Sequence, residues 1–194
     1  MPIFSFLLFV LISSFTPGPN NFLAMTYAKQ YGLKRSITFC LGVAFGFFII
    51  TSLCSFFNIV LINMLPLIEF PLKILGVAYM LYLAFKILTS KSNTDTNEKS
   101  NKNLFLVGIM LQFVNPKGIL FGLTVVSTFI LPYYHSYSSY LFFSLFLGIV
   151  GLMSTFSWCL FGSMFQKLLL KHNRTFNIIM AVLLVFSAIS IVIN

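Results

Sequence analysis

Acidic residues are almost missing from this chain. Glu69, Asp95 and Glu98 are the only three among 194 residues, and the histidines are His135 and His172. An enzyme needs a nucleophile beside a base, or a cluster of metal ligands, and no motif of the HExxH kind is present. We therefore predict that the protein is not an enzyme and holds neither a metal ion nor a cofactor.

Cysteine is also rare. Cys40, Cys54 and Cys159 lack the CxxC spacing of zinc and redox sites, so we interpret them as small apolar core residues. No basic segment precedes the first apolar run, which argues against a cleaved signal peptide. We expect that run to remain as a helix.

Charge of either sign is scarce, and apolar residues dominate. Charged residues make up 8% of the chain, hydrophobic residues 59%, and the mean hydropathy is +0.99. Globular domains carry roughly a quarter charged residues. The composition predicts an all-α polytopic membrane protein with about six transmembrane helices, since each needs about 20 apolar residues. The expected spans are residues 3–28, 37–63, 68–89, 104–130, 138–165 and 175–193.

The expected domain organisation is one transmembrane transporter domain over residues 1–194, in two halves, 1–90 and 104–194. Residues 91–103 between the halves are polar and contain nothing that could bury apolar area. We predict a solvated cytoplasmic linker there.

Basic residues alternate between the predicted loops. Three loops hold nearly all of them, and the others receive only Lys73. Because positive residues stay cytoplasmic, both termini are predicted outside a bacterial cytoplasmic (inner) membrane. This topology and the lipid bilayer explain the net charge of +9 without nucleic acid. The loop residues are Lys29, Lys34 and Arg35, then Lys86, Lys91, Lys99 and Lys102, then Lys167, Lys171 and Arg174.

Proline motifs interrupt two of the apolar spans. The first motif is Thr16-Pro17-Gly18-Pro19-Asn20-Asn21, and the second is Asn115-Pro116-Lys117-Gly118. Proline lacks an N–H group, so helices through these motifs would leave the carbonyls of Ser13, Phe15 and Gln112 unpaired. A membrane tolerates such breaks only where protein or a watery cavity satisfies them, and paired breaks mark transporter binding sites. We predict that the first and fourth helices are broken here.

The two halves are expected to be inverted repeats. Three spans in each half force the halves to enter the membrane from opposite sides. Phe6-Leu7 lies eleven residues before Pro17, and Phe105-Leu106 lies eleven before Pro116, a faint internal symmetry. The sequence thus predicts two inverted three-helix halves.

The motifs together resemble those of the LysE/RhtB-type amino-acid exporters. The resemblance rests on the TPGPN block from Thr16, on Tyr31-Gly32 and Leu41-Gly42, on the stretch from Leu75 to Ala84, and on Asn115-Pro116-Lys117. It covers nearly the whole chain and keeps the order of the motifs. It implies export of amino acids or related metabolites, driven by an ion gradient, and leaves the substrate open.

Lys117 is the basic residue expected near the centre of a span. A central lysine costs about 2.5–3.5 kcal/mol, so it should face a cavity or a partner. We predict that Lys117 holds the carboxylate of an amino acid, helped by N–H groups at the half-helix starts after Gly18 and Pro116. The alternative is a structural role, in which Lys117 pairs with freed carbonyls.

The remaining candidate substrate-binding residues surround the two breaks. Asn20, Asn21 and Asn115 offer both donors and acceptors, which suits a zwitterion, although they could instead satisfy freed carbonyls. Gly18 supplies backbone freedom and close approach. The full predicted site comprises Thr16, Pro17, Gly18, Pro19, Asn20, Asn21, Gln112, Asn115, Pro116 and Lys117.

Transport is thus the predicted function. We expect a secondary-active exporter of amino acids or related small metabolites, with alternating access to a midplane site between the broken helices. A small-solute or ion channel of the same layout is the alternative. A coupling proton is a further expected partner, with Lys117 as its candidate carrier, while the oligomeric state stays open.

Overall fold

The computed structural model describes residues 1–89 and 103–193, so the predicted linker lies almost entirely outside the described residues. Within these two ranges the regular structure is helical and contains no strand. The all-α prediction is confirmed.

Both predicted breaks are present. The first span consists of α1 (Ile3–Phe15) and α2 (Pro19–Tyr31), whose axes differ by 46°. The fourth consists of α5 (Leu104–Val114) and α6 (Pro116–Val125), continued by the π-helical turn η1 (Val126–Ile130), with a bend of 66°. Each second helix begins with proline at its first position, where the missing N–H costs no hydrogen bond.

The other spans are unbroken helices. They are α3 (Leu33–Phe56), α4 (Asn58–Thr89), α7 (Tyr137–Met164) and α9 (Asn173–Ile193), with the short α8 (Gln166–Lys171) between the last two. Four helices of the described chain are long and apolar enough to cross a membrane, and counting each broken pair as one span gives six. The protein is a multi-pass membrane protein.

The connection expected at residues 64–67, between the second and third spans, lies instead at Phe57. Helix α3 already ends at Phe56, and α4 begins at Asn58 and runs through Pro66 and Pro71. Proline removes one backbone hydrogen bond and can kink a helix without ending it. Apolar residues that could cross the membrane still begin near Glu69, as expected.

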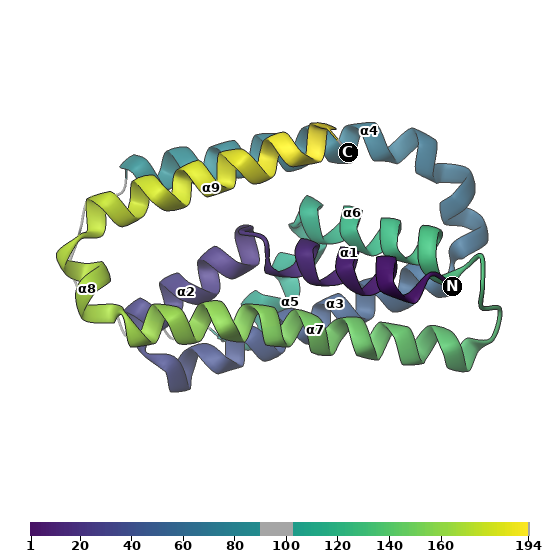
Figure 1. Cartoon of the computed structure of the whole chain (residues 1–194), viewed down its shortest axis with the longest axis horizontal. Coiled ribbons are helices and arrows are strands. Elements are labelled where there is room, and N and C mark those ends of the chain that lie inside the picture. Colours follow the sequence, from purple (N-terminus) through teal and green to yellow (C-terminus); the bar gives the residue numbers. More distant parts are fainter. Residues whose placement is uncertain (90–102, 194) are drawn as a thin grey trace.

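The helices give the bundle two distinct ends. At one end lie the N-terminus and the hairpin with Tyr133 and Tyr137, and we call this the tyrosine end. At the other lie the α2–α3 connection, the end of α4, and α8, and we call this the basic end, after Lys34, Lys86 and Lys171 (Figure 1). Helix α1 starts at the tyrosine end and α5 at the basic end, so the two broken spans run in opposite directions.

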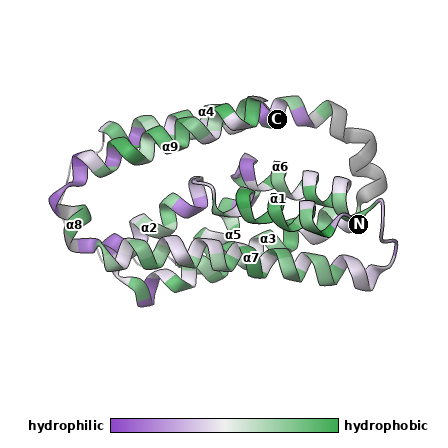
Figure 2. Cartoon of the chain, in the orientation of Figure 1, coloured by the Kyte–Doolittle hydropathy of each residue, from purple (hydrophilic) through white to green (hydrophobic). Residues whose placement is uncertain are grey.

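The helices pack in two layers. Helices α4 and α9 lie side by side in one layer, and the broken helices with α3 and α7 form the other (Figure 1). Hydrophobic residues cover most of the helices, whereas hydrophilic residues gather at the basic end and where α2 and α6 begin (Figure 2). Large exposed residues such as Phe4 and Phe85 suit a lipid surrounding.

Candidate functional site

The first break is built from the residues between α1 and α2. Gly18 caps α2 in an extended conformation, with φ −164° and ψ 177°, and Pro19 starts the helix. A Cβ atom at Gly18 would lie 3.1 Å from Cδ and 3.2 Å from Nζ of Lys117. The glycine therefore leaves the space through which the Lys117 side chain passes.

Side chains satisfy the carbonyls that the first break releases. Asn21 Nδ2 donates to the carbonyls of Ser14, at 3.0 Å, and Thr16, at 3.1 Å, and Ser154 Oγ donates to Ser14 at 2.7 Å. Trp158 Nε1 donates to the Phe15 carbonyl at 3.3 Å. Asn21 thus has the structural role that was the alternative to substrate binding, although it satisfies different carbonyls from those expected.

The second break is shorter. Asn115 alone separates α5 from α6, in an extended conformation with φ −91° and ψ 97°. Its backbone N–H donates to the Gln112 carbonyl at 3.4 Å, so this carbonyl, expected to be unpaired, has a partner. Pro116 packs against α4, where a Cβ at Gly76 would meet it at 3.1 Å.

Lys117 joins the two breaks. Its ammonium group donates to the carbonyls of Thr16, at 3.0 Å, and Pro17, at 3.1 Å, across a sequence separation of about one hundred residues. The carboxylate of Glu69, the one acidic side chain within the described ranges, is 2.9 Å from Lys73 instead. Lys117 therefore has carbonyl partners but no anionic partner in the described part of the chain.

Three side-chain amides form a chain between the breaks. Asn20 Nδ2 donates to Gln112 Oε1 at 3.1 Å, and Asn20 Oδ1 accepts from Asn115 Nδ2 at 3.0 Å. Gln112 and Asn115 are buried, with 0% and 2% exposure. Among the described residues, the side chains of Asn20 and Asn115 bond other side-chain amides rather than backbone carbonyls.

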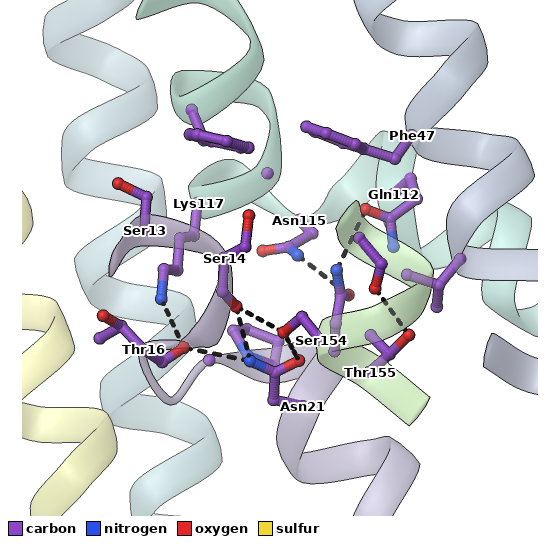
Figure 3. Close-up of a pocket in the computed structure, with 17 residues that line it drawn as sticks. Ser13, Ser14, Thr16, Asn21, Phe47, Gln112, Asn115, Lys117, Ser154 and Thr155 are labelled. Carbon is purple, nitrogen blue, oxygen red and sulfur yellow. Dashed lines mark hydrogen bonds between the residues drawn. The ribbon is translucent and has the colours of Figure 1, made fainter. Parts of the chain in front are cut away.

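A cavity of about 60 Å³ lies between the breaks. Figure 3 shows Lys117, Ser14, Asn21, Asn115 and Gln112 around it. Eight of the ten predicted site residues line it, and Pro17 and Pro116 do not. The predicted residues in its wall are Thr16, Gly18, Pro19, Asn20, Asn21, Gln112, Asn115 and Lys117.

Sequence reasoning missed part of the wall. Ser14, Ser154 and Thr155 supply further polar groups, and Phe47 and Phe121 supply rings. Ser154 and Thr155 are adjacent polar residues in an apolar span, a signal that could have identified them. The contribution of the phenylalanines could not be found in this way, because the chain contains 25 of them.

Different contacts close the two sides of the cavity. Toward the tyrosine end, the rings of Phe47 and Phe121 stack with centroids 5.4 Å apart and an interplanar angle of 7°. Toward the basic end, a Cβ at Gly42 would overlap the Phe105 carbonyl, and one at Gly162 would overlap the Met25 carbonyl. Helix backbones touch on this side.

Comparisons with known proteins identify a family and several relatives of this chain. The family described as LysE type translocator matches residues 11–194. The cysteine/O-acetylserine efflux protein of Salmonella typhimurium is 38% identical over 187 residues, covering 96% of this chain and 95% of that protein. The protein of the same description from Klebsiella pneumoniae is 37% identical over 190 residues, covering 98% and 96%. No solved structure matches the chain.

Proposed function

Because the chain belongs to the LysE family of translocators, we propose that it exports a small polar amino acid, of the cysteine and O-acetylserine kind, across the bacterial cytoplasmic membrane. The observation that carries the proposal is a cavity with polar side chains in its wall, inside an apolar bundle. Its wall includes an ammonium group with no anionic partner within the described residues. The substrate class is taken from the relatives, which are named as efflux proteins for these two compounds.

We assign the substrate carboxylate to Lys117. An ammonium group has three N–H donors, and two of them bind the carbonyls of Thr16 and Pro17. The third remains for a carboxylate, whose negative charge would offset the cost of a lysine at the membrane centre, about 2.5–3.5 kcal/mol. If Lys117 only caps the two carbonyls, its loss should weaken the fold rather than substrate binding.

Transport requires the cavity to widen. A volume of about 60 Å³ exceeds the roughly 10–15 Å³ that one water molecule needs, but it is far below the roughly 300–1,000 Å³ of ligand pockets. We propose alternating access, in which the contacts on the two sides of the cavity open in turn as one half rocks against the other. The relatives are efflux proteins, which favours this carrier over a channel.

We place the basic end in the cytoplasm and both termini outside, in agreement with the distribution of basic residues. Coupling to a proton gradient is part of the proposal. Glu69 is paired with Lys73, so Lys117 is the candidate proton carrier among the residues described in the cavity wall. Efflux that does not respond to collapse of the pH gradient would remove the proton from the mechanism.

Efflux from preloaded cells tests the proposal. The rate of efflux from cells loaded with labelled cysteine or O-acetylserine is compared between the wild type and Lys117→Met at matched membrane abundance. Loss of one charge-assisted hydrogen bond should weaken apparent affinity about 10-fold or more in the variant. Lys73→Met is the matched control, since it removes a lysine from the surface pair with Glu69, outside the cavity.

Two results would contradict the proposal in different places. No efflux of either amino acid by the wild type would overturn the substrate class. Efflux that Lys117→Met leaves unchanged would keep the exporter and remove Lys117 as the carboxylate site. Saturable efflux with competition between substrates would separate the carrier from the channel.

A further inference from the structure

The amide chain across the cavity fixes the direction of each of its members. Asn20 occupies the middle and uses both ends of its amide, as donor to Gln112 and as acceptor from Asn115. The bond from Asn115 Nδ2 to Asn20 turns the other side of the Asn115 amide, its Oδ1, away from Asn20. Figure 3 shows this oxygen directed toward the space beside Lys117 and Ser14.

The oxygen that faces this space has no partner among the described residues. Asn115 Oδ1 is buried and accepts no hydrogen bond from any described residue, although Asn115 is only 2% exposed. Gln112 Nε2, at the other end of the row of three amides, is likewise buried and unpaired within the described ranges. A buried polar group without a partner is costly, so each such group in a native protein calls for an explanation, and a functional role is one.

The charge of Lys117 favours one of the two possible orientations of the three amides. Turning all three amides over together would preserve both inter-amide bonds but would direct Asn115 Nδ2 into the cavity. Both Asn115 and Lys117 line this cavity. A carbonyl oxygen directed toward space shared with an ammonium is favoured over a donor, because opposite partial charges attract. The wall thus offers one cation and one unpaired acceptor.

These two groups match the two ends of a zwitterion. We infer that Asn115 Oδ1 accepts a hydrogen bond from the α-ammonium group of the substrate while Lys117 holds its carboxylate, which restricts the site to free α-amino acids. This inference rests on the proposed function. Asn20 and Gln112 are positioning residues, since they orient the Asn115 amide. A carboxylate without an α-amino group would leave the buried oxygen unpaired and bind less tightly.

A pair of compounds that differ only in the amino group tests the inference. Counterflow of labelled, reduced cysteine is measured in proteoliposomes that contain the purified protein. The competitors are unlabelled cysteine and 3-mercaptopropionate, which is cysteine without its amino group. In the wild type, 3-mercaptopropionate should compete about 10- to 100-fold more weakly than cysteine. In Asn115→Leu, the affinity for cysteine should fall while the affinity for 3-mercaptopropionate does not. The ratio of the two affinities should therefore fall to about 3-fold or less.

Gln30→Leu is the matched control, because it removes an exposed amide from α2 outside the cavity wall and should keep the wild-type ratio. Asn20→Leu should lower the ratio partially, as expected for a residue that orients Asn115. If Asn115→Leu does not transport, fluorescence titration of Trp158, the one tryptophan of the chain, gives the binding ratio directly. Its indole bonds the Phe15 carbonyl at the first break.

The outcomes separate this inference from the proposed function. Cysteine counterflow with equal competition by 3-mercaptopropionate in the wild type would overturn the inference alone. An Asn115→Leu variant that keeps the full wild-type ratio, by counterflow or by titration, would do the same. No cysteine counterflow and no binding by the wild type would overturn the proposed function and this inference together.

Discussion

The two sides of the cavity are held together by different kinds of contact. On the side toward the basic end, glycines bring helix backbones together, with Gly42 on the Phe105 carbonyl and Gly108 on the Phe39 carbonyl. On the side toward the tyrosine end, contacts are made by rings, with Phe47 on Phe121 at 5.4 Å and Phe9 on Phe121 at 5.6 Å.

This difference indicates where the protein can move. Helices in a membrane associate through close packing, and small residues give the tightest contact because no side chain separates the backbones. Backbone contacts separate only when whole helices move, whereas a ring can change its rotamer. We therefore expect the side toward the tyrosine end to open more readily than the side toward the basic end.

The largest effect is expected from Gly42→Ala, on the side with backbone contacts. The new Cβ would overlap the Phe105 carbonyl, and backbone cannot yield as a flexible side chain can. Overpacking typically costs about 1–3 kcal/mol, and contact with backbone places this variant near the upper value. Membrane abundance and resistance of the purified protein to heating should both fall. Unchanged values would show that this side of the cavity is loosely packed.

A smaller loss of stability but a clear change in transport is expected from Phe121→Ala, on the side with rings. Phe121 is partly exposed, so the cost should be about 2 kcal/mol, below the roughly 3–5 kcal/mol of a buried phenylalanine. Removal of one ring of the stack should let cysteine leak in both directions through de-energised membranes.

Entry of labelled cysteine into de-energised vesicles measures the leak. Phe121→Leu is the control, because it retains most of the side-chain volume and should leak less than Phe121→Ala. A Phe121→Ala variant that does not leak cysteine would show that the ring pair does not close the cavity.

The comparison also shows what the sequence could and could not predict. The breaks at Pro19 and Pro116 were predictable, because a missing N–H is a property of the residue itself. The Gly42-x-x-x-Gly46 spacing, typical of closely packed membrane helices, is likewise visible in the sequence, and both glycines lie against α5. Local chemistry therefore revealed where the helices end and where they approach closely.

Contacts that depend on distant helices were not predictable. The carbonyl partners of the first break include Ser154 and Ser187, which lie about 140 and 170 residues from their acceptors, the carbonyls of Ser14 and Pro17. Whether a proline kinks or ends a helix is also decided by packing, which explains why the connection expected at residues 64–67 lies within α4. Hydropathy marks a residue as apolar but does not give its neighbours.

The smallest effect, and one of opposite sign, is expected from Gly122→Ala. This glycine lies in α6, beyond the break toward the tyrosine end, and its new Cβ would meet Ile50 and Thr51 methyl groups at 3.6 Å, an ordinary contact distance. Alanine within a helix is favoured over glycine by roughly 0.5–1 kcal/mol, so resistance to heating should stay equal or rise slightly. Gly42→Ala and Gly122→Ala make the same chemical change on opposite sides of the cavity. Similar losses from both would mean that backbones are closely packed on each side, and the expected difference in opening would then disappear.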